Sequence, residues 1–224
     1  MHIGLIGGIG PAATEYYYRG LIERHAASGT PLDLTIVNAE VCDLGRNLAD
    51  NAPQRQAEIF APLVARLAAA GARIAAVTSM GGHFCIRELE TLSRLPILNA
   101  IPEVEAEIKR RGLKTIGILG TRKVMESKLY GALSSVKVMV PEGPAFDDVA
   151  KAYTDMASVG RVDDAQRRVF FSAGERLRSQ GAEAIVLGGT DLFLAFQGQD
   201  CGFPLLDCAE IHVEAIYKKS LAAA

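Results

Sequence analysis

Hydroxyl and imidazole groups gather just after one apolar run of the sequence. The stretch VTSMGGH, residues 77–83, ends that run in Thr78, Ser79 and His83. A serine hydroxyl takes part in proton transfer when a neighbouring base accepts its proton. His83 follows Ser79 by four residues, so it could activate this hydroxyl if the turn between them folds back. The alternative is a capping or packed histidine at the start of a helix.

Small residues in the same region favour the close approach of a ligand. Gly82 lies in this turn, and Gly8, Ile9 and Gly10 follow the first apolar run, residues 2–7. Glycine lets a ligand reach the backbone amides because no side chain stands in the way. We therefore predict that these four residues contribute to a binding site.

Two further segments offer groups that recognise a carboxylate. The segment GTRKVMES provides Thr121 and Arg122, and the segment GGTDLF provides Thr190. Hydroxyls donate hydrogen bonds to a carboxylate, and the planar fork of an arginine meets it with two. Thr78 and Ser79 belong to the same predicted set of donors. Arg122 could instead pair with a surface acid, and that alternative stays open.

Apolar runs alternate with amphipathic helical stretches along the chain, which is typical of a parallel sheet covered by helices. Strands are expected near residues 2–7, 33–38, 73–78, 96–98, 115–119, 136–139 and 184–188. Helices are expected near residues 11–27, 52–70, 102–111, 123–133, 145–157, 162–180 and 207–221. Because ligands of such α/β folds bind beyond the carboxyl ends of the strands, the polar segments should lie at that edge.

The chain also contains two pairs of similar segments. GLIGGIGPAAT resembles GILGTRKVMES, and GARIAAVTSM resembles GAEAIVLGGT. Both pairs are separated by nearly the same number of residues, which favours a duplicated half over a chance likeness of buried strands. We expect two pseudosymmetric, doubly wound α/β domains with parallel sheets and an interdomain cleft. Their expected extents are residues 1–98 plus 208–224 and residues 99–207.

The composition of the chain argues against nucleic-acid and membrane partners. With 224 residues, 49% of them hydrophobic, the chain can bury one large core or two smaller ones. The 24 lysines and arginines do not exceed the 26 acidic residues, so no basic surplus is available for nucleic acid. No apolar segment is long enough to span a bilayer. The four cysteines lack zinc-finger spacing with the histidines, which suits free thiols in a reducing cytoplasm.

The glycine-containing segments, taken in order, resemble the aspartate/glutamate racemase superfamily, in its aspartate-racemase-like amino-acid racemase branch. GLIGGIGPAATEYYY is similar to the opening motif of that branch, and ILGTRKVMESKLY is similar to its LLGTRxTMExxxY motif. GGTD stands where relatives have GCTE, and PLLDCAEIH fits the closing motif P-x-x-D-x-x-x-I-H. NAEVCDL corresponds to SVDFxEI, so the resemblance runs through essentially the whole chain.

The resemblance implies two pseudosymmetric α/β domains with the active site between them, often in a homodimer. It implies interconversion of amino-acid enantiomers without a metal or an organic cofactor; relatives in the wider superfamily act on glutamate, hydantoins, maleate or arylmalonates. The expected partners are a small amino acid or related carboxylate and a second copy of the chain. Glu40 stands where relatives have an acidic residue, and it could bind an ammonium group or cap a helix.

The sequence departs from the family at both positions that carry the reacting thiols. Racemisation needs an acid and a base on opposite faces of Cα, and relatives supply them as two cysteines. Ser79 stands at the first of these positions and Gly189 at the second. Met80 and Val124 replace the usual Asn and Thr, which makes the pocket more apolar. These changes predict an altered substrate, a different reaction or lost activity.

Other side chains could carry protons in place of the thiols. His212 matches a histidine of the closing motif and is the preferred candidate, the alternative being a buried histidine bonded to a backbone carbonyl. His83 is the second candidate, through its neighbour Ser79. A structural role is favoured for the cysteines, as is usual for free thiols.

Three functions stay open at this point. The chain can be a racemase or related isomerase that works through Ser79, His83 or His212. It can be a ligand-binding protein that keeps the site and has lost the reaction. It can also be a lyase or decarboxylase in which an enolate, held by amides and hydroxyls, is protonated from one side only.

Overall fold

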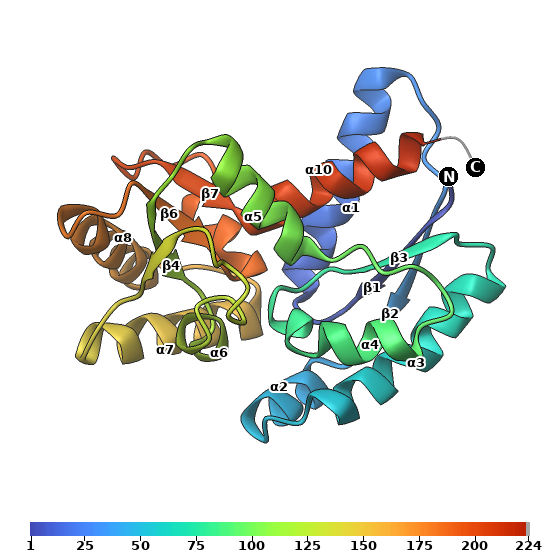
Figure 1. Ribbon diagram of the computed structural model, residues 1–224, viewed down its shortest axis with the longest axis horizontal. Helices are drawn as coiled ribbons and strands as arrows, with labels where there is room; N and C mark the ends of the chain where they lie inside the picture. Colours follow the sequence, from blue (N-terminus) through green and yellow to red (C-terminus); the bar gives the residue numbers. More distant parts are fainter. Residues whose placement is uncertain (223–224) are drawn as a thin grey trace. The chain divides into compact units, whose positions relative to one another are not determined.

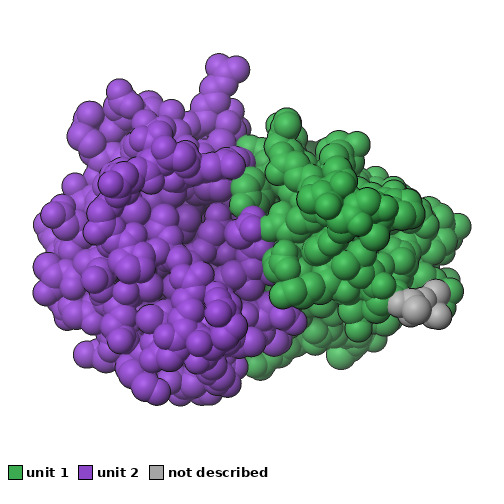
Figure 2. All heavy atoms as spheres, turned by 90° about the horizontal axis from the view of Figure 1, so that it is seen from above, with its two compact units in different colours: residues 1–100, 212–224 green, residues 101–211 purple. Residues whose placement is uncertain are grey.

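The computed structural model describes residues 1–222 of the chain. These divide into two compact units, shown in Figure 2: unit 1 is residues 1–100 with the stretch from His212 onward, and unit 2 is residues 101–211. Each unit contains a parallel β-sheet with helices packed on it, so the predicted α/β class is confirmed. Within the described part of the chain, no helix is both long and apolar enough to cross a membrane.

Unit 1 is built on a parallel sheet with the strand order β2-β1-β3. An isolated parallel pairing between Ala75 and Ile97 extends this sheet beyond β3. The elements are β1 (Ile3–Gly7), α1 (Pro11–Ser28), β2 (Leu34–Asn38), α2 (Val41–Ala49), α3 (Pro53–Ala69), β3 (Ile74–Val77), the 3-10 turn η1 (Gly81–Cys85), α4 (Ile86–Leu92) and most of α10 (Cys208–Leu221).

The central strand of unit 1 is buried because helices cover both faces of the sheet. Figure 1 shows α1 on one side of the sheet and α3 on the other. A Cβ on Gly4 would stand 2.9 Å from Leu67 Cδ1, so α3 packs directly on the backbone of β1. All five residues of β1 are buried, and α3 continues through Pro62. This packing holds the carboxyl ends of β1 and β3 at one edge of the sheet.

Unit 2 is built on a second parallel sheet, with the strand order β5-β4-β6-β7. The elements are α5 (Ala100–Arg110), β4 (Thr115–Leu119), α6 (Arg122–Glu126), β5 (Lys137–Met139), α7 (Pro144–Val159), α8 (Asp164–Ser179), β6 (Ala184–Leu187), the 3-10 turn η2 (Thr190–Leu192), α9 (Phe193–Phe196) and β7 (Leu205–Asp207).

Helices α7 and α8 form the main core of unit 2 with strands β4 and β6. Tyr153 and Phe170 contribute large buried rings to that core, and Ile185 contributes from the sheet. A Cβ on Gly117 would stand 2.9 Å from Leu177 Cδ1, so α8 packs on β4 as closely as α3 packs on β1. The core therefore fixes α7 beside the carboxyl end of β6.

Several helix ends follow from local sequence. Helix α1 begins with Pro11, whose missing N–H costs nothing in the first turn, and ends at Gly29 in the left-handed conformation, with φ 64°. Helix α8 begins with a capping box, in which Asp163 accepts from the Gln166 amide and Gln166 accepts from the Asp163 amide. These signals explain why both helices lie close to their predicted ranges.

The structure corrects one predicted helix. The stretch 123–133 was expected to be one helix, but α6 ends at Glu126. Lys128, Leu129 and Tyr130 then adopt positive φ angles of 49°, 56° and 59°, which reverse the chain. Left-handed backbone costs about 1–2 kcal/mol per residue for residues other than glycine. Three such residues in a row are therefore not expected from a sequence, and this turn could not be predicted from the helical pattern of the segment.

Candidate functional site

The carboxyl end of β3 carries two buried hydroxyl groups. Thr78 is fully buried, and its Oγ1 donates to the carbonyl oxygen of Ile6 at 3.1 Å. The same Oγ1 lies 3.2 Å from Thr14 Oγ1 at the start of α1. Thr78 therefore ties the end of β3 to the end of β1, which is a structural use of a predicted binding residue.

The Ser79 hydroxyl keeps its donor capacity. Ser79 is 5% exposed, and its Oγ accepts a hydrogen bond from the Gly82 amide at 3.2 Å. A Cβ on Gly82 would stand 2.8 Å from Val77 Cγ1, so only glycine lets this turn close on the serine. Since the oxygen accepts, the hydroxyl hydrogen remains to be donated to another group.

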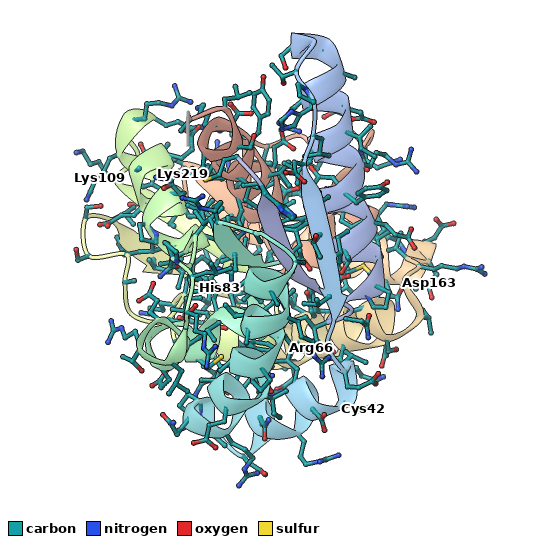
Figure 3. All side chains as sticks on the ribbon, turned by 90° about the vertical axis from the view of Figure 1, so that its right-hand side faces the viewer. Cys42, Arg66, His83, Lys109, Asp163 and Lys219 are labelled. Carbon is teal, nitrogen blue, oxygen red and sulfur yellow. The ribbon has the colours of Figure 1, made fainter. Side chains whose placement is uncertain are left out.

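His83 is fixed by the backbone on both sides of its ring. Its Nδ1 donates to the carbonyl oxygen of Ser79 at 2.7 Å, and its Nε2 accepts from the Ala100 amide at 3.2 Å. Burial lowers the pKa of His83 to about 4, although the bond to Ser79 acts in the opposite direction. Figure 3 shows His83 in the interior. The ring is therefore neutral at pH 7, and its tautomer is set by these two bonds.

His212, in α10, has a similar environment. Its Nδ1 accepts from the Tyr17 hydroxyl and its Nε2 donates to the carbonyl oxygen of Leu98, each at 3.0 Å. Its ring meets that of His83 edge to face, with centroids 5.4 Å apart. Burial, and after it the neighbouring His83, lowers the pKa of His212 to about 3. A proton-carrying role for either histidine would require one of these buried bonds to open.

The glycine turn after β1 is shaped by close backbone contacts. Gly8 has a φ of +84°, and its amide donates to Thr14 Oγ1 at 2.9 Å. A Cβ at Gly8 would overlap Asn38 Oδ1 and stand 2.5 Å from the carbonyl oxygen of Ala39. Ile9 and Gly10 are buried in the same turn. The predicted glycine segment therefore does lie at the carboxyl edge of the sheet of unit 1.

Two other predicted residues of unit 1 differ in exposure. Met80, which follows Ser79 in the sequence, is fully buried. Glu40 is exposed at the start of α2, and its side chain makes no capping bond to that helix. Glu40 is therefore available to a charged group, whereas Met80 contributes apolar packing.

The predicted carboxylate-binding pair of unit 2 is engaged within the unit. The side chain of Thr121 accepts from the Val124 amide at 3.2 Å and so caps α6. Arg122 is exposed, donates to Asp147 Oδ1 at 2.6 Å and lies 5.2 Å from the centre of the Phe146 ring. Of the two roles open for Arg122, the structure shows the surface ion pair.

The space beside Gly189 is filled by another side chain. Gly189 follows β6 and has φ −117° and ψ 127°, a conformation open to any residue. A Cβ there would overlap Tyr153 Cε2 and stand 2.8 Å from the Tyr153 hydroxyl oxygen. That hydroxyl donates to Asp191 Oδ2 at 3.0 Å, in a buried bond between α7 and η2. Sequence reasoning missed Tyr153, whose only signal is an apolar position in a helix.

The four cysteines differ in accessibility, and the two most buried are the least reactive. Cys42 is exposed, as Figure 3 shows, and Cys201 is half-buried. Burial raises the pKa of Cys85 to about 12 and raises the pKa of Cys208 well above its usual value. A thiol with so high a pKa supplies almost no thiolate at pH 7. This geometry supports structural roles for Cys85 and Cys208.

One carboxyl of unit 2 titrates near neutrality. Asp207 ends β7, where its Cα pairs with that of Leu187 in β6. Its Oδ1 accepts from the amides of Ala209 and Glu210 and so caps α10. Burial raises the pKa of Asp207 to about 7 in spite of these bonds. Perturbed carboxyls of this kind at strand ends are candidates for acid–base chemistry.

No metal centre is formed by the side chains that the structure describes. Within residues 1–222, no group of three or more His, Cys, Asp or Glu side chains is arranged to hold a metal ion.

Comparison with known families gives one match over most of the chain. The family model described as Asp/Glu/Hydantoin racemase matches residues 6–216. That range includes both sheets and the strand ends described above.

Comparison with solved structures gives the same family. A candidate Asp/Glu racemase from Yersinia pestis is 26% identical, with a TM-score of 0.85 over 99% of this chain and 100% of that one. An aspartate racemase homologue from Pyrococcus horikoshii is 24% identical, with a TM-score of 0.81 over 99% of each chain. Glutamate racemase from Francisella tularensis, solved with D-glutamate, is 12% identical over 97% of this chain and 80% of that one, with a TM-score of 0.65. The last two show likeness of fold alone.

Proposed function

Because the chain belongs to the Asp/Glu/Hydantoin racemase family, we propose that it binds a small amino acid or related carboxylate and exchanges a proton at Cα. The proposed reaction uses no cofactor and no pair of thiols. The observation that carries it is Ser79, a buried hydroxyl at the end of β3 whose hydrogen is left to be donated. A homodimer, as the family resemblance implies, and a cytoplasmic location, as the cysteine pattern favours, are part of the same proposal.

Ser79 is the group of unit 1 that we assign to the ligand. A hydroxyl held by the Gly82 amide can donate to a carboxylate, and more strongly to the enolate formed when Cα loses its proton. His83 holds the carbonyl of Ser79 and so positions this turn. His212 packs on His83 and supports it in turn. We assign positioning roles to both histidines, because each ring nitrogen already has a buried partner.

Asp207 is the carboxyl that best suits the proton-accepting role. A general base works best when its pKa lies near the operating pH, and the pKa of Asp207 is raised to about 7. Its position at the end of β7, paired with β6, supports a place at the carboxyl edge of the sheet of unit 2. Asp207 would therefore accept the Cα proton of a ligand bound at this edge of unit 2.

A ligand-binding protein without catalysis is the second candidate. It is favoured by the packing of Tyr153 at Gly189, which leaves no room for the second family thiol. A lyase or decarboxylase of the same superfamily is the third, since protonation of an enolate from one face needs only one acid. Both candidates share the binding site and differ from the first in the reaction.

Incubation in D2O tests the proposal. The wild-type protein is mixed with single amino acids, and deuterium at Cα is measured by mass spectrometry. We expect exchange with at least one amino acid, and we expect Ser79→Ala and Asp207→Asn each to slow it roughly a hundredfold. Ser172→Ala, an exposed serine on α8, is the matched control and should exchange at the wild-type rate.

Thermal stabilisation by the same compounds separates the candidates. A ligand that binds only the folded state raises the apparent stability. Stabilisation without exchange would favour the ligand-binding protein and contradict the proposed reaction. If Ser79→Ala exchanged deuterium at the wild-type rate, Ser79 would have no part in the proposed reaction. Release of carbon dioxide from malonate-like compounds would favour the decarboxylase.

A further inference from the structure

Along residues 1–222, the chain passes between its two compact units at two places. It leaves unit 1 after Ala100, the first residue of α5, and it returns between Ile211 and His212, inside α10. We call residues 98–101 the first crossing and residues 208–212 the second crossing. Hinges between compact units are a few residues at the ends of elements, where the backbone angles change. The two crossings are therefore the places at which a motion of one unit against the other has to be accommodated.

A hydrogen bond joins the two crossings to each other. His212 Nε2, in the second crossing, donates to the carbonyl oxygen of Leu98, in the first, at 3.0 Å. The His212 ring is fully buried, and its Nδ1 accepts from the Tyr17 hydroxyl on α1 at 3.0 Å. With a partner at each nitrogen, the ring is held in one orientation. The separation between the two points at which the chain leaves unit 1 is fixed in this way.

His83 fastens the first crossing to the body of unit 1. Its Nε2 accepts from the Ala100 amide at 3.2 Å, and its Nδ1 donates to the carbonyl oxygen of Ser79 at 2.7 Å. The first N–H groups of a helix have no partner within it, so the bond to Ala100 determines where α5 begins. The rings of His83 and His212 meet edge to face, with centroids 5.4 Å apart.

We infer that His83 and His212 form a latch that holds both crossings and so restrains the motion of one unit against the other. Neither crossing can move without opening one of these bonds. An opened bond leaves a buried polar group without a partner, which is unfavourable. Because His83 also holds the carbonyl of Ser79, the latch connects the turn that carries the proposed ligand-binding hydroxyl to both crossings. That connection rests on the proposed function, whereas the latch itself does not.

Pulsed EPR measures the motion of the units. Spin labels are placed on the exposed Cys42 of unit 1 and on Glu175→Cys, at an exposed position of unit 2, in a Cys201→Ser background that prevents labelling of the half-buried thiol. The width of the distance distribution between the labels then reports how freely the units move.

His212→Asn is the variant that opens the latch. Asparagine keeps an acceptor for Tyr17 and is too short to donate to Leu98, so the distribution should become roughly twofold wider. His212→Gln places an amide nitrogen near the position of Nε2 and should restore most of the wild-type width. His83→Asn keeps a donor for the Ser79 carbonyl and loses the Ala100 amide, so it should widen the distribution as well.

His25→Asn is the matched control. His25 is a buried histidine of unit 1, 4% exposed, and its ring nitrogens lie 2.9 Å from the hydroxyls of Ser220 and Thr30. None of these residues belongs to a crossing. The variant loses hydrogen bonds of the same kind, and we expect it to keep the wild-type width.

Amide hydrogen exchange separates a latch from a general loss of stability. In His212→Asn, peptides that cover the two crossings should exchange about tenfold faster, whereas peptides from β1 and β4 should keep the wild-type rate. A distribution as narrow in His212→Asn as in the wild-type protein would overturn the inference. Equal widening by His25→Asn, or faster amide exchange throughout β1 and β4, would show a merely structural role and overturn it too. No ligand is used, so these outcomes leave the proposed function standing.

Discussion

Acidification from pH 6.5 to 4.5 is expected to lower the free energy of unfolding by about 3 kcal/mol. His83 and His212 have folded-state pKa values of about 4 and about 3, below the unfolded value of 6.5. In this range the unfolded chain binds more protons at each site, so each histidine costs stability as the pH falls, at about 1.4 kcal/mol per pH unit.

Asp207 acts in the opposite direction over the whole of this pH range. Its folded-state pKa of about 7 lies above the unfolded value of 3.8, so the folded state binds the extra proton and gains stability on acidification. One such carboxyl offsets about one histidine, and the net slope is that of the remaining histidine, about 1.4 kcal/mol per pH unit. Urea unfolding at several pH values measures this slope directly.

Substitution of His212 provides the control for this prediction. His212→Leu removes one titrating ring, so the net slope should fall to nearly zero even though the variant is less stable. Leu21→Ala, at a buried residue of α1, should lower stability by about 2–5 kcal/mol at every pH and keep the wild-type slope. A wild-type slope in His212→Leu would show that the ring is not buried as a neutral group.

Gly8→Ala is expected to destabilise the protein by about 2–5 kcal/mol. The φ of +84° at Gly8 is costly for any residue with a Cβ, at about 1–2 kcal/mol. The new methyl group would also press on the carbonyl oxygen of Ala39 at 2.5 Å, and overpacking of this kind costs about 1–3 kcal/mol. The turn after β1 should therefore distort, and ligand-dependent stabilisation should fall with it.

Gly45→Ala is the matched control for this change. Gly45 lies within helix α2, and a Cβ there would meet no atom within 4 Å. Alanine is the better helix former, so this variant should gain about 0.5–1 kcal/mol. Urea unfolding of both variants gives the comparison. Equal stability of Gly8→Ala and the wild-type protein would contradict the close contacts described for the glycine turn.

The central strands of both sheets could be predicted because they are buried on both faces. Continuous apolar runs such as Ile3–Gly7 and Thr115–Leu119 have few alternative structures when helical patterns flank them. The three-residue strand Leu205–Asp207 was missed because it is short and runs directly into helix α10, so that its residues were read as the start of that helix. Helices Val41–Ala49 and Ile86–Leu92 were missed because each makes only about two turns, which is too short for a clear helical periodicity.

The site could be predicted in part, since small and polar residues at strand ends are visible in the sequence. Ser79 and Gly189 were expected at strand ends, and the structure has them just after β3 and β6; their roles in a site stay predictions. Tyr153 was not, because its place depends on how α7 packs on β6 and not on any spacing within the sequence. The bonds that hold His83 and His212 also come from packing between distant segments.

The central claim is that a proton is transferred at Cα without thiols. It is tested by measuring deuterium exchange at Cα after the cysteines of the protein have been alkylated. Iodoacetamide should modify the exposed Cys42 first and leave the buried Cys85 and Cys208 unmodified. The protein so treated is then incubated in D2O with the amino acid that wild-type protein exchanges best. We predict that deuterium enters Cα at the unmodified rate. If the exchange rate fell in proportion to the fraction of thiols modified, proton transfer without thiols would be contradicted, and a cysteine would be the reacting group.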